Sequence, residues 1–545
     1  MYAKLLAYEI RSRYRADARS FGAFIVTIAA ASGIVAAGLP GISGSTAVLA
    51  YALCALTPVA CAIAAMADYW KTLYGQRGYF TMSLPVSGTT IFWAKTTRMV
   101  IECLLALALA VLGARGWLGR SAAGILGRTV YIGELGLDGS VHSVRGVLPS
   151  VQAAVAAGIE EIVVAQEAAA EAELVPGARV TAVRHIGQLV ERYGGRLSAA
   201  VAAALEQISE AATDDAPTTP PRDAELPDLA DVVGQSEARQ ALEVAAAGGH
   251  HLIMVGPPGT GKTMLAERLP SILPPLEQAD AVTVTSLHSV AGIFDPARGL
   301  ITRPPLRAPH HTATRAAVVG GGSGLPRPGD VSLAHRGVLF LDEAPEFSAG
   351  VLDCLRQPLE SGVVTIDRVG GRASYPAAFQ LVLAANPCPC GKAGGRGLEC
   401  TCTSLQRRRY FSRLSGPLLD RVDIQVEVGA VSAADLASTG QGELSAAVAQ
   451  RVLRARRAAE RRLADTPWRL NAEVPGAYLR GPDGGLSAPL SRRLMTALER
   501  GDLSLRGVDR VLRLAWTLAD LEGVETLALA HIGTALALRT SGVRP

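Results

Sequence analysis

The sequence predicts an α/β fold in which a P-loop-type parallel sheet is followed by a helical lid. A small α/β piece and an N-terminal hydrophobic helical segment precede that sheet. Three observations support this prediction. Short apolar runs that each end in polar residues are typical of buried parallel strands. Residues 206–228 are rich in Thr, Asp and Pro and have no hydrophobic period, which predicts a linker. Residues 441–545 are rich in Arg, Leu and Ala at helical spacing.

Length and composition set broad limits on the function. The chain has 545 residues, enough for several domains at the usual size of about 150 residues each. Its net charge is only +4, so the chain as a whole does not have the basic character of many nucleic-acid-binding proteins. The eight cysteines do not form the pattern of a secreted disulfide framework. Local motifs must therefore indicate the function.

Residues 1–118 form the hydrophobic, membrane-like segment. Runs at 21–39 and about 45–66 are long enough to span a bilayer, and a third run at 99–114 is interrupted by Glu102. Basic residues precede the first run and follow the second, and the positive-inside rule places both of these flanks in the cytoplasm. The third run fits a buried core helix equally well. We expect a retained N-terminus with contact to a membrane.

The next boundaries follow from changes in composition. Residues 119–205 alternate short strands, such as 161–165, with alanine-rich helices, and they are few for a complete α/β domain. After the linker at 206–228, residues 229–440 carry the chemical motifs. Residues 441–545 form the predicted lid.

A phosphate-binding loop follows the first apolar run of the main domain. Residues 251–255 predict a buried strand, and residues 264–269 continue as a helix, which is the context that a Walker A motif requires. Backbone N–H groups of such a loop wrap phosphates, the lysine reaches the β- and γ-phosphates of ATP, and the hydroxyl ligates Mg²⁺. The alternative is a chance loop. The predicted ATP-binding residues are Gly256, Pro257, Pro258, Gly259, Thr260, Gly261, Lys262 and Thr263.

Two further strands end in polar residues that suit the same site. Residues 337–341 lead into Asp342 and Glu343, the pattern of a Walker B motif. Asp342 would hold Mg²⁺ and Glu343 would activate the attacking water as a general base. Residues 380–385 end in Asn386, and here the chain resembles AAA+ proteins, which place a polar residue between the two Walker strands to position the same water. The alternatives are a solvated acidic pair and an asparagine that caps a turn.

Four cysteines form a separate group, with Cys388 and Cys390 followed by Cys400 and Cys402. Four thiolates suffice for a structural Zn²⁺, although two C-x-C pairs differ from the usual C-x2-C spacing. Redox chemistry and inert thiols are the alternatives. The adjacent His310 and His311 are expected to have a structural or pore-facing role.

Several segments make the chain similar to the magnesium-chelatase-like YifB/ComM family of AAA+ ATPases, over about residues 131–540. The Walker motifs belong to this resemblance. The other matching segments are residues 307–312 (RAPHHT), 318–322 (VVGGG), 326–330 (PRPGD), 332–335 (SLAH), 386–391 (NPCPCG) and 414–423 (LSGPLLDRVD).

The resemblance implies a homo-oligomeric ring, commonly a hexamer, with ATP at the subunit interfaces. Arg421 matches the arginine finger that reaches a neighbouring subunit's γ-phosphate, and Arg506 matches the sensor arginine of the lid. Arg510 is the second candidate for the sensor. For each of them the alternative is an ordinary surface arginine.

The resemblance also suggests contacts with DNA. Residues 363–372 predict a hairpin, which in this family points at the central pore, so Arg368 and Arg372 are DNA-contact candidates. The basic stretch 407–410 (RRRY) is another candidate, and solvated surface charge is the alternative for both. The arginine-dense helix at 451–462 is expected to be a solvated face.

One part of the chain departs from the family pattern. Family members begin with a complete Lon-like domain, of which only the C-terminal end is visible here, while residues 1–118 resemble the start of an ABC-type permease. The leading hypothesis is an ATP-driven ring motor that acts on DNA in branch migration and recombination of transforming DNA. Its ATPase domains would be cytoplasmic, and membrane-tethered through residues 1–118. The alternatives are a chelatase-type protein-remodelling ATPase and a membrane transport component.

Overall fold

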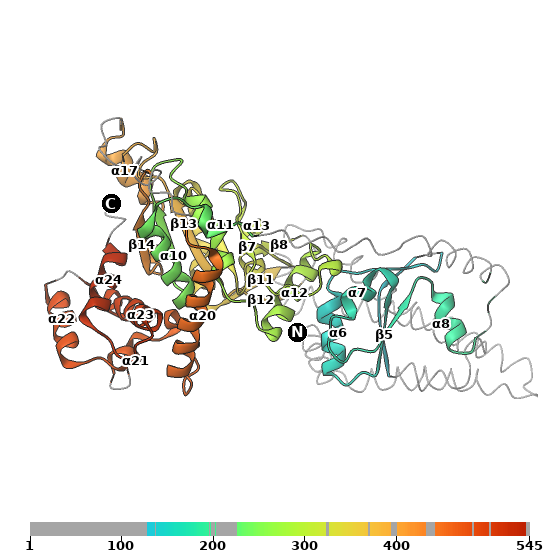
Figure 1. Ribbon diagram of the computed structural model, residues 1–545. Helices are drawn as coiled ribbons and strands as arrows, with labels where there is room; N and C mark the ends of the chain where they lie inside the picture. Colours follow the sequence, from blue (N-terminus) through green and yellow to red (C-terminus); the bar gives the residue numbers. More distant parts are fainter. Residues whose placement is uncertain are drawn as a thin grey trace, which may run out of the picture. The chain divides into compact units, whose positions relative to one another are not determined.

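The computed structural model describes residues 128–136, 138–195, 197, 202, 226–322, 326–368, 371–393, 400–431, 442–481, 484–500 and 503–540. The chain divides into two compact units, which we describe separately. The smaller unit lies mainly before residue 217 and the larger one mainly after it (Figure 1). The predicted hydrophobic segment lies outside the described residues. Within the described residues, no helix is long and apolar enough to cross a bilayer.

The smaller unit is built on a parallel sheet with strand order β1-β4-β5. The predicted strand at residues 161–165 is confirmed as β4, whose last four residues are buried. A short antiparallel pair, β2 and β3, accompanies this sheet. The elements are β1 (Thr129–Ile132), β2 (Glu134–Leu135), β3 (Val141–His142), α6 (Val147–Ala156), β4 (Glu161–Ala165), α7 (Ala169–Ala172), β5 (Val180–Val183) and α8 (Ile186–Arg192).

The larger unit contains a five-stranded parallel sheet with the order β14-β6-β13-β10-β7. The strand that ends before Asn386, β13, lies between the two Walker strands β6 and β10, as predicted. All carboxyl ends of parallel strands meet at one edge, so the residues that follow these strands are brought together there. The strands are β6 (Leu252–Val255), β7 (Leu306–Arg307), β10 (Val338–Leu341), β13 (Gln380–Ala385) and β14 (Ile424–Glu427).

Both faces of this sheet are buried, which explains its uninterrupted apolar strands. In β6, Leu252 and Met254 belong to the hydrophobic cluster that also contains lid residues. Ile253 and Val255 point to the opposite face and belong to a second cluster. Strand side chains alternate between faces, so one apolar run serves both clusters.

Helices cover the sheet and continue into the lid. Helix α20 packs against α10, α11 and α23, and α23 packs against α24. The helices are α10 (Ser236–Gly248), α11 (Lys262–Ile272), α12 (Gln278–Ala291), α13 (Arg315–Val319), α14 (Asp330–Leu333), α15 (Ala349–Cys354), α16 (Arg356–Ser361), α17 (Ser404–Phe411), α18 (Gly416–Leu419), α20 (Ser445–Arg462), α21 (Gly476–Arg480), α22 (Ala488–Glu499), α23 (Leu505–Glu522) and α24 (Leu529–Thr540).

In the described residues of the larger unit, two antiparallel hairpins lie outside the main sheet. The predicted hairpin is present as β11 (Val363–Arg368) and β12 (Gly371–Pro376). The other hairpin joins β8 (Gly320–Gly321) and β9 (Arg327–Pro328). Gly320 has φ +109°, and a Cβ there would lie 2.4 Å from a backbone carbonyl oxygen, so the first strand of that hairpin needs glycine.

The expectation that the arginine-dense helix is a solvated face was wrong for three of its arginines. Arg451 forms an ion pair with Glu243 of α10. Arg456 donates hydrogen bonds to the backbone carbonyl of Ala246, which is also in α10. Arg462 pairs with Asp520 of α23. These long side chains hold α20 against its neighbours because only their charged ends need polar partners.

Candidate nucleotide site

The loop between β6 and α11 has the backbone geometry of a phosphate-binding loop. Gly256 must be glycine, since a Cβ there would lie 2.1 Å from the carbonyl oxygen of Val428. Gly259 and Gly261 have φ +77° and +89°, and a Cβ at either position would point into open space. The loop therefore leaves room for a ligand above its N–H groups, and the N-terminus of α11 favours an anion there.

Lys262 opens α11 and lies over the loop that precedes it. Its ammonium group donates hydrogen bonds to the carbonyl oxygens of Gly256 and Pro257 at 2.6 and 2.8 Å. It also donates to Oδ1 of Asn386 at 3.3 Å. Burial lowers the pKa of Lys262, while the nearby carboxylates of Asp342 and Glu343 act in the opposite direction. The predicted phosphate-binding lysine and sensor asparagine thus share one location.

Thr263 and Asp342 are also brought together. The Thr263 hydroxyl donates a hydrogen bond to Oδ2 of Asp342 at 2.7 Å, although the two residues are 79 positions apart. A hydroxyl and a carboxylate at this separation are hard oxygen ligands that suit one Mg²⁺ ion. The residues present therefore fit the magnesium ion that the motifs imply.

Glu343 follows Asp342 in an uncommon backbone conformation. Its φ is +49°, in the left-handed region that few residues other than glycine adopt. Its N–H group is held by Oδ1 of Asp342 at 2.9 Å. Its side-chain oxygen lies 3.4 Å from Nδ1 of His311. Strained backbone at such a position is typical of functional sites, where surrounding contacts maintain it.

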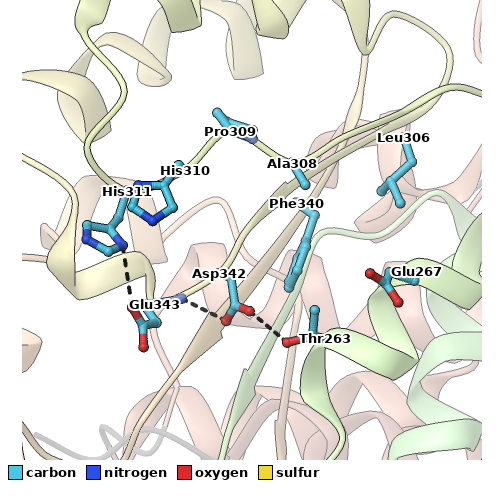
Figure 2. A pocket seen from close by; sticks show the side chains of 10 residues that line it. All are labelled: Thr263, Glu267, Leu306, Ala308, Pro309, His310, His311, Phe340, Asp342 and Glu343. Atoms are coloured by element: carbon cyan, nitrogen blue, oxygen red, sulfur yellow. Dashed lines mark hydrogen bonds and ion pairs between the residues drawn. The ribbon is translucent and has the colours of Figure 1, made fainter.

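A cavity of about 270 Å³ lies between these groups and the segment that follows β7. Figure 2 shows Thr263, Asp342 and Glu343 next to one another, with His310 and His311 directly above Glu343. The two histidine rings have centroids 4.1 Å apart. His310 also contacts a neighbouring threonine hydroxyl at 2.8 Å. Both histidines face the nucleotide cavity, a placement that their expected structural or pore-facing role did not include. The lining residues are Thr263, Glu267, Leu306, Ala308, Pro309, His310, His311, Phe340, Asp342 and Glu343.

The predicted arginines lie outside this cavity. Arg421 forms an ion pair with Glu360, and burial lowers its pKa. Arg506 is exposed, with its guanidinium 3.5 Å from Asp420. Neither arginine lines the cavity of its own chain.

A buried polar network joins the sheet domain to the lid, and we call it the core–lid network. His250 contacts Asp423 at 3.0 Å and the Thr517 hydroxyl at 2.7 Å. Asn471 donates to the same hydroxyl at 3.0 Å. Arg510, which was the second candidate for the sensor, lies buried with its Nε 3.5 Å from Asp423. Arg510 therefore belongs to the contact between the sheet domain and the lid.

The four cysteines of the predicted metal group lie together at the end of β13. All four sulfurs are within 4.8 Å of one another, and all four thiols are free. Cys388 is fully buried and the other three cysteines are half-buried. A glycine three residues after Cys388, Gly391, sits so close to the phosphate-binding loop that a Cβ would lie 2.6 Å from Pro258. The thiol group therefore adjoins the nucleotide site.

Two side chains of the site were missed by the sequence analysis. For His311 the sequence predicted only a structural or pore-facing role. Gln235 was not considered, yet its amide donates hydrogen bonds to the carbonyls of Thr260 and Gly429 at 3.3 and 2.6 Å. The strand before His311 is only Leu306–Arg307, so no apolar run in the sequence indicates that His311 lies at the same sheet edge as the Walker residues. We find no local signal for Gln235 either.

The sheet order, the loop between β6 and α11, the acidic pair after β10 and the helical lid define the AAA+ class of P-loop proteins. Three family models match: "Magnesium chelatase, subunit ChlI" over residues 228–436, "Magnesium chelatase, subunit ChlI C-terminal" over 442–539 and "Subunit ChlI of Mg-chelatase" over 104–168. The last match begins within the segment expected to be membrane-like.

The chain is also similar to several bacterial proteins. It is 51% identical to an uncharacterized protein of Mycobacterium tuberculosis over 424 residues, which is 77% of this chain and 80% of that protein. It is 38% identical to the competence protein ComM of Haemophilus influenzae (75% and 77% covered) and 37% identical to YifB of Escherichia coli (75% and 76% covered). The chain belongs to the magnesium-chelatase-like YifB/ComM family. Nothing in these comparisons supports the permease resemblance of residues 1–118.

Proposed function

We propose that this protein is an ATP-hydrolysing ring motor that acts on DNA. The observation that carries the ATPase part is the convergence of Lys262, Asn386 and the Thr263–Asp342 pair at one sheet edge, with Glu343 beside them. Lys262 and Thr263 open the helix that follows β6, Asp342 and Glu343 follow β10, and Asn386 follows β13. A surface without nucleotide chemistry would have no need to gather them.

Each residue has a role that its geometry suits. The N–H groups of the loop and the Lys262 ammonium bind the phosphates. Thr263 and Asp342 would hold Mg²⁺, which neutralises phosphate charge when it is bound. Glu343, held by His311, orients a water molecule and accepts its proton. Asn386 fixes the position of the same water from the neighbouring strand.

We further propose that Arg421 completes the site of a neighbouring subunit. Arg421 lies outside its own chain's cavity, so it can contribute to nucleotide chemistry only across an interface. Glu360, which is exposed, holds it in place within the chain. Arg506, also exposed, is proposed as the lid's sensor arginine. A homo-oligomeric ring, commonly a hexamer, satisfies both assignments.

This ring arrangement can be tested by mixing two inactive variants. Lys262→Ala removes phosphate binding and Arg421→Ala removes the proposed finger, and each variant alone should lose ATP hydrolysis. In mixed rings, an Arg421→Ala subunit, whose Lys262 is intact, will sometimes lie next to a Lys262→Ala subunit, whose Arg421 is intact. The interface between them then has both residues. We expect mixing to restore part of the activity. Activity that stays absent after mixing, with oligomers shown to exchange subunits, would contradict the assignment of Arg421.

The DNA part of the proposal rests on the competence protein ComM among the relatives and on basic residues near the sheet. Arg372 on the β11–β12 hairpin pairs with Asp367 at 3.4 Å. Both side chains are exposed, so the Arg372 guanidinium is accessible to DNA and stays a DNA-contact candidate. Arg368 occupies the other side of the hairpin turn. We place the ATPase in the cytoplasm, where ATP and DNA are both available.

The test of this part is ATP hydrolysis by the full chain with single-stranded and branched DNA across a salt series. Stimulation by DNA that weakens with added salt is the expected result, because phosphate contacts release counterions. Hydrolysis that is indifferent to both kinds of DNA would remove the DNA proposal and leave the ATPase proposal intact. In that case the second candidate, a chelatase-type ATPase that remodels a partner protein, is favoured by the matching chelatase family models.

A further inference from the structure

We propose that Cys388, Cys390, Cys400 and Cys402 bind one Zn²⁺ ion, and that this ion fixes helix α17 as a DNA-contacting element. The second half of this inference rests on the proposed action on DNA. It adds a metal site and a contact surface to that function. Neither element is part of the Walker chemistry.

The sulfur geometry suits a tetrahedral ion. A Zn–S bond of about 2.3 Å places the sulfurs of a Cys₄ site about 3.8 Å apart. The Cys388 and Cys390 sulfurs are 3.3 Å apart, and each lies 3.7 Å from the Cys400 sulfur. A disulfide would bring two of them to about 2.0 Å. The group therefore has the dimensions of a single-metal site.

Backbone N–H groups support the thiolates. The Cys390 sulfur accepts a hydrogen bond from the backbone N–H of Lys392, and the Cys400 sulfur accepts one from the N–H of Cys402. Such outer-shell donors orient ligands and stabilise their negative charge. Four inert thiols would not need this arrangement.

The metal group leads directly into a basic helix. Helix α17 begins two residues after Cys402 and carries Arg407, Arg408 and Arg409 in succession, all exposed. Within the described part of the chain, none of the three guanidinium groups has an ion-pair partner. In Figure 1, α17 projects from the larger unit. Exposed and unpaired arginines on a projecting helix suit a phosphate backbone better than a role in folding.

Helix α17 is also tied to the nucleotide site. Its buried Tyr410 accepts a hydrogen bond from the backbone N–H of Asn386, the proposed sensor residue. Just beyond the helix, Arg413 bonds to Glu346 and to the Pro345 carbonyl, immediately after the Walker B strand. A displacement of α17 by DNA would thus reach Asn386 through one side chain. This gives a physical route by which DNA can change the hydrolysis rate.

The experiment uses the full chain and two readouts, elemental analysis for zinc and fluorescence anisotropy with a labelled single-stranded oligonucleotide. The test variant is Arg407→Ala/Arg408→Ala/Arg409→Ala. The matched control is Arg454→Ala/Arg457→Ala/Arg461→Ala, which removes the same charge from exposed positions of α20. A Cys400→Ser/Cys402→Ser variant removes two ligands.

We expect about one zinc ion per chain in the wild type and in both arginine variants, and much less in the cysteine variant. The test variant should bind DNA at least about 10-fold more weakly, with a salt slope smaller by roughly 2, since each single-strand phosphate contact adds about 0.7. The control should change DNA affinity less than about twofold. The elemental analysis of wild-type protein does not depend on whether the cysteine variant folds.

Three results would overturn the inference in distinguishable ways. Wild-type protein without zinc would remove the metal site. Test and control variants that bind DNA equally would remove the role of α17 and leave the proposed function standing. Wild-type protein that binds no DNA would contradict the proposed function itself, and the DNA half of the inference with it.

Discussion

The nucleotide cavity and the core–lid network are assembled in different ways. The cavity uses groups placed at the ends of neighbouring strands, and several of its charged groups reach solvent: the Glu343 side chain, for example, is 49% exposed. The core–lid network draws His250, Asp423 and Thr517 from distant parts of the chain, and all three are buried. Substitutions in the cavity should therefore change chemistry with little effect on folding, whereas substitutions in the network should first change stability.

The largest expected effect is on catalysis, from Glu343→Gln. Loss of a general base typically slows a reaction about 10²–10⁴-fold, so ATP hydrolysis should fall by that range while ATP binding persists. The measurement is steady-state hydrolysis alongside nucleotide binding. The matched control is Glu460→Gln, which makes the same change at an exposed position of α20, outside the cavity lining. Near-normal hydrolysis by the Glu343→Gln variant would show that another group acts as the general base.

The strongest test of the network is Asp423→Ala. Burial alone would raise the pKa of Asp423, but the hydrogen bond from His250 and nearby positive charges outweigh it, and the net pKa is lowered. Removing this carboxylate leaves the buried Arg510 without its ion-pair partner, which typically costs about 3–5 kcal/mol of unfolding free energy. Chemical denaturation measures this loss.

The matched control for Asp423→Ala is Asp420→Ala. Asp420 is 51% exposed and its ion pair with the exposed Arg506, at 3.5 Å, is a surface pair. Removing it should therefore cost less than about 1 kcal/mol of unfolding free energy. Equal stability losses at the two positions would show that the network is no more important than surface charge.

A smaller effect on the unfolding free energy is expected when the pH is lowered. Burial lowers the pKa of His335 and of His251 to about 4, from an ordinary value of 6.5. The imidazole of each accepts a backbone N–H at 3.0 Å, which requires an unprotonated nitrogen. Because the folded state binds these protons more weakly, their stabilisation is complete above about pH 6.5 and decreases as the pH falls towards 4.

This loss is at most about 3.5 kcal/mol for each histidine, since the pKa is lowered from 6.5 to about 4 and one pKa unit corresponds to about 1.4 kcal/mol. Urea unfolding at a series of pH values measures it. His335→Gln should flatten the dependence between about pH 6.5 and pH 4. An unfolding free energy that is independent of pH over this interval would show that neither histidine is held neutral by the fold.

The smallest expected effect concerns His311→Ala. His311 contacts the Glu343 carboxylate at 3.4 Å without belonging to the phosphate loop, so its loss should disturb the orientation of the base. We expect kcat to fall roughly 3- to 10-fold with little change in KM for ATP, about 1 kcal/mol in the transition state. His142→Ala is the control, because His142 is an exposed histidine of the smaller unit and does not line the cavity. A change in KM alone would show that His311 binds nucleotide.

The same contrast explains what could be predicted from the sequence. The phosphate loop, Asp342, Glu343 and Asn386 could be predicted because each follows a buried strand directly, and carboxyl ends of parallel strands share one edge. The lid could be predicted as helical from its periodicity. The contact of His311 with Glu343 depends on β7 pairing beside β10, which no local pattern reveals.

The core–lid network could not be predicted for a similar reason. His250 and Thr517 are 267 positions apart, and each alone is an ordinary polar residue. The arginines of α20 were misjudged because charge spacing on a helix does not show which neighbours its long side chains reach. The hydrophobic runs of the first 118 residues lie outside the described residues, so their predicted membrane contact remains a prediction.

We propose above all that the site formed after β6, β13 and β10, with the cavity beside it, is an ATPase site. The most direct test is ATP hydrolysis by the full chain with Mg²⁺, compared between wild type and Lys262→Ala, with thermal unfolding of both as a check on folding. We predict hydrolysis by the wild type and at least about a 100-fold loss in the folded variant. Equal hydrolysis by the two proteins would contradict the claim.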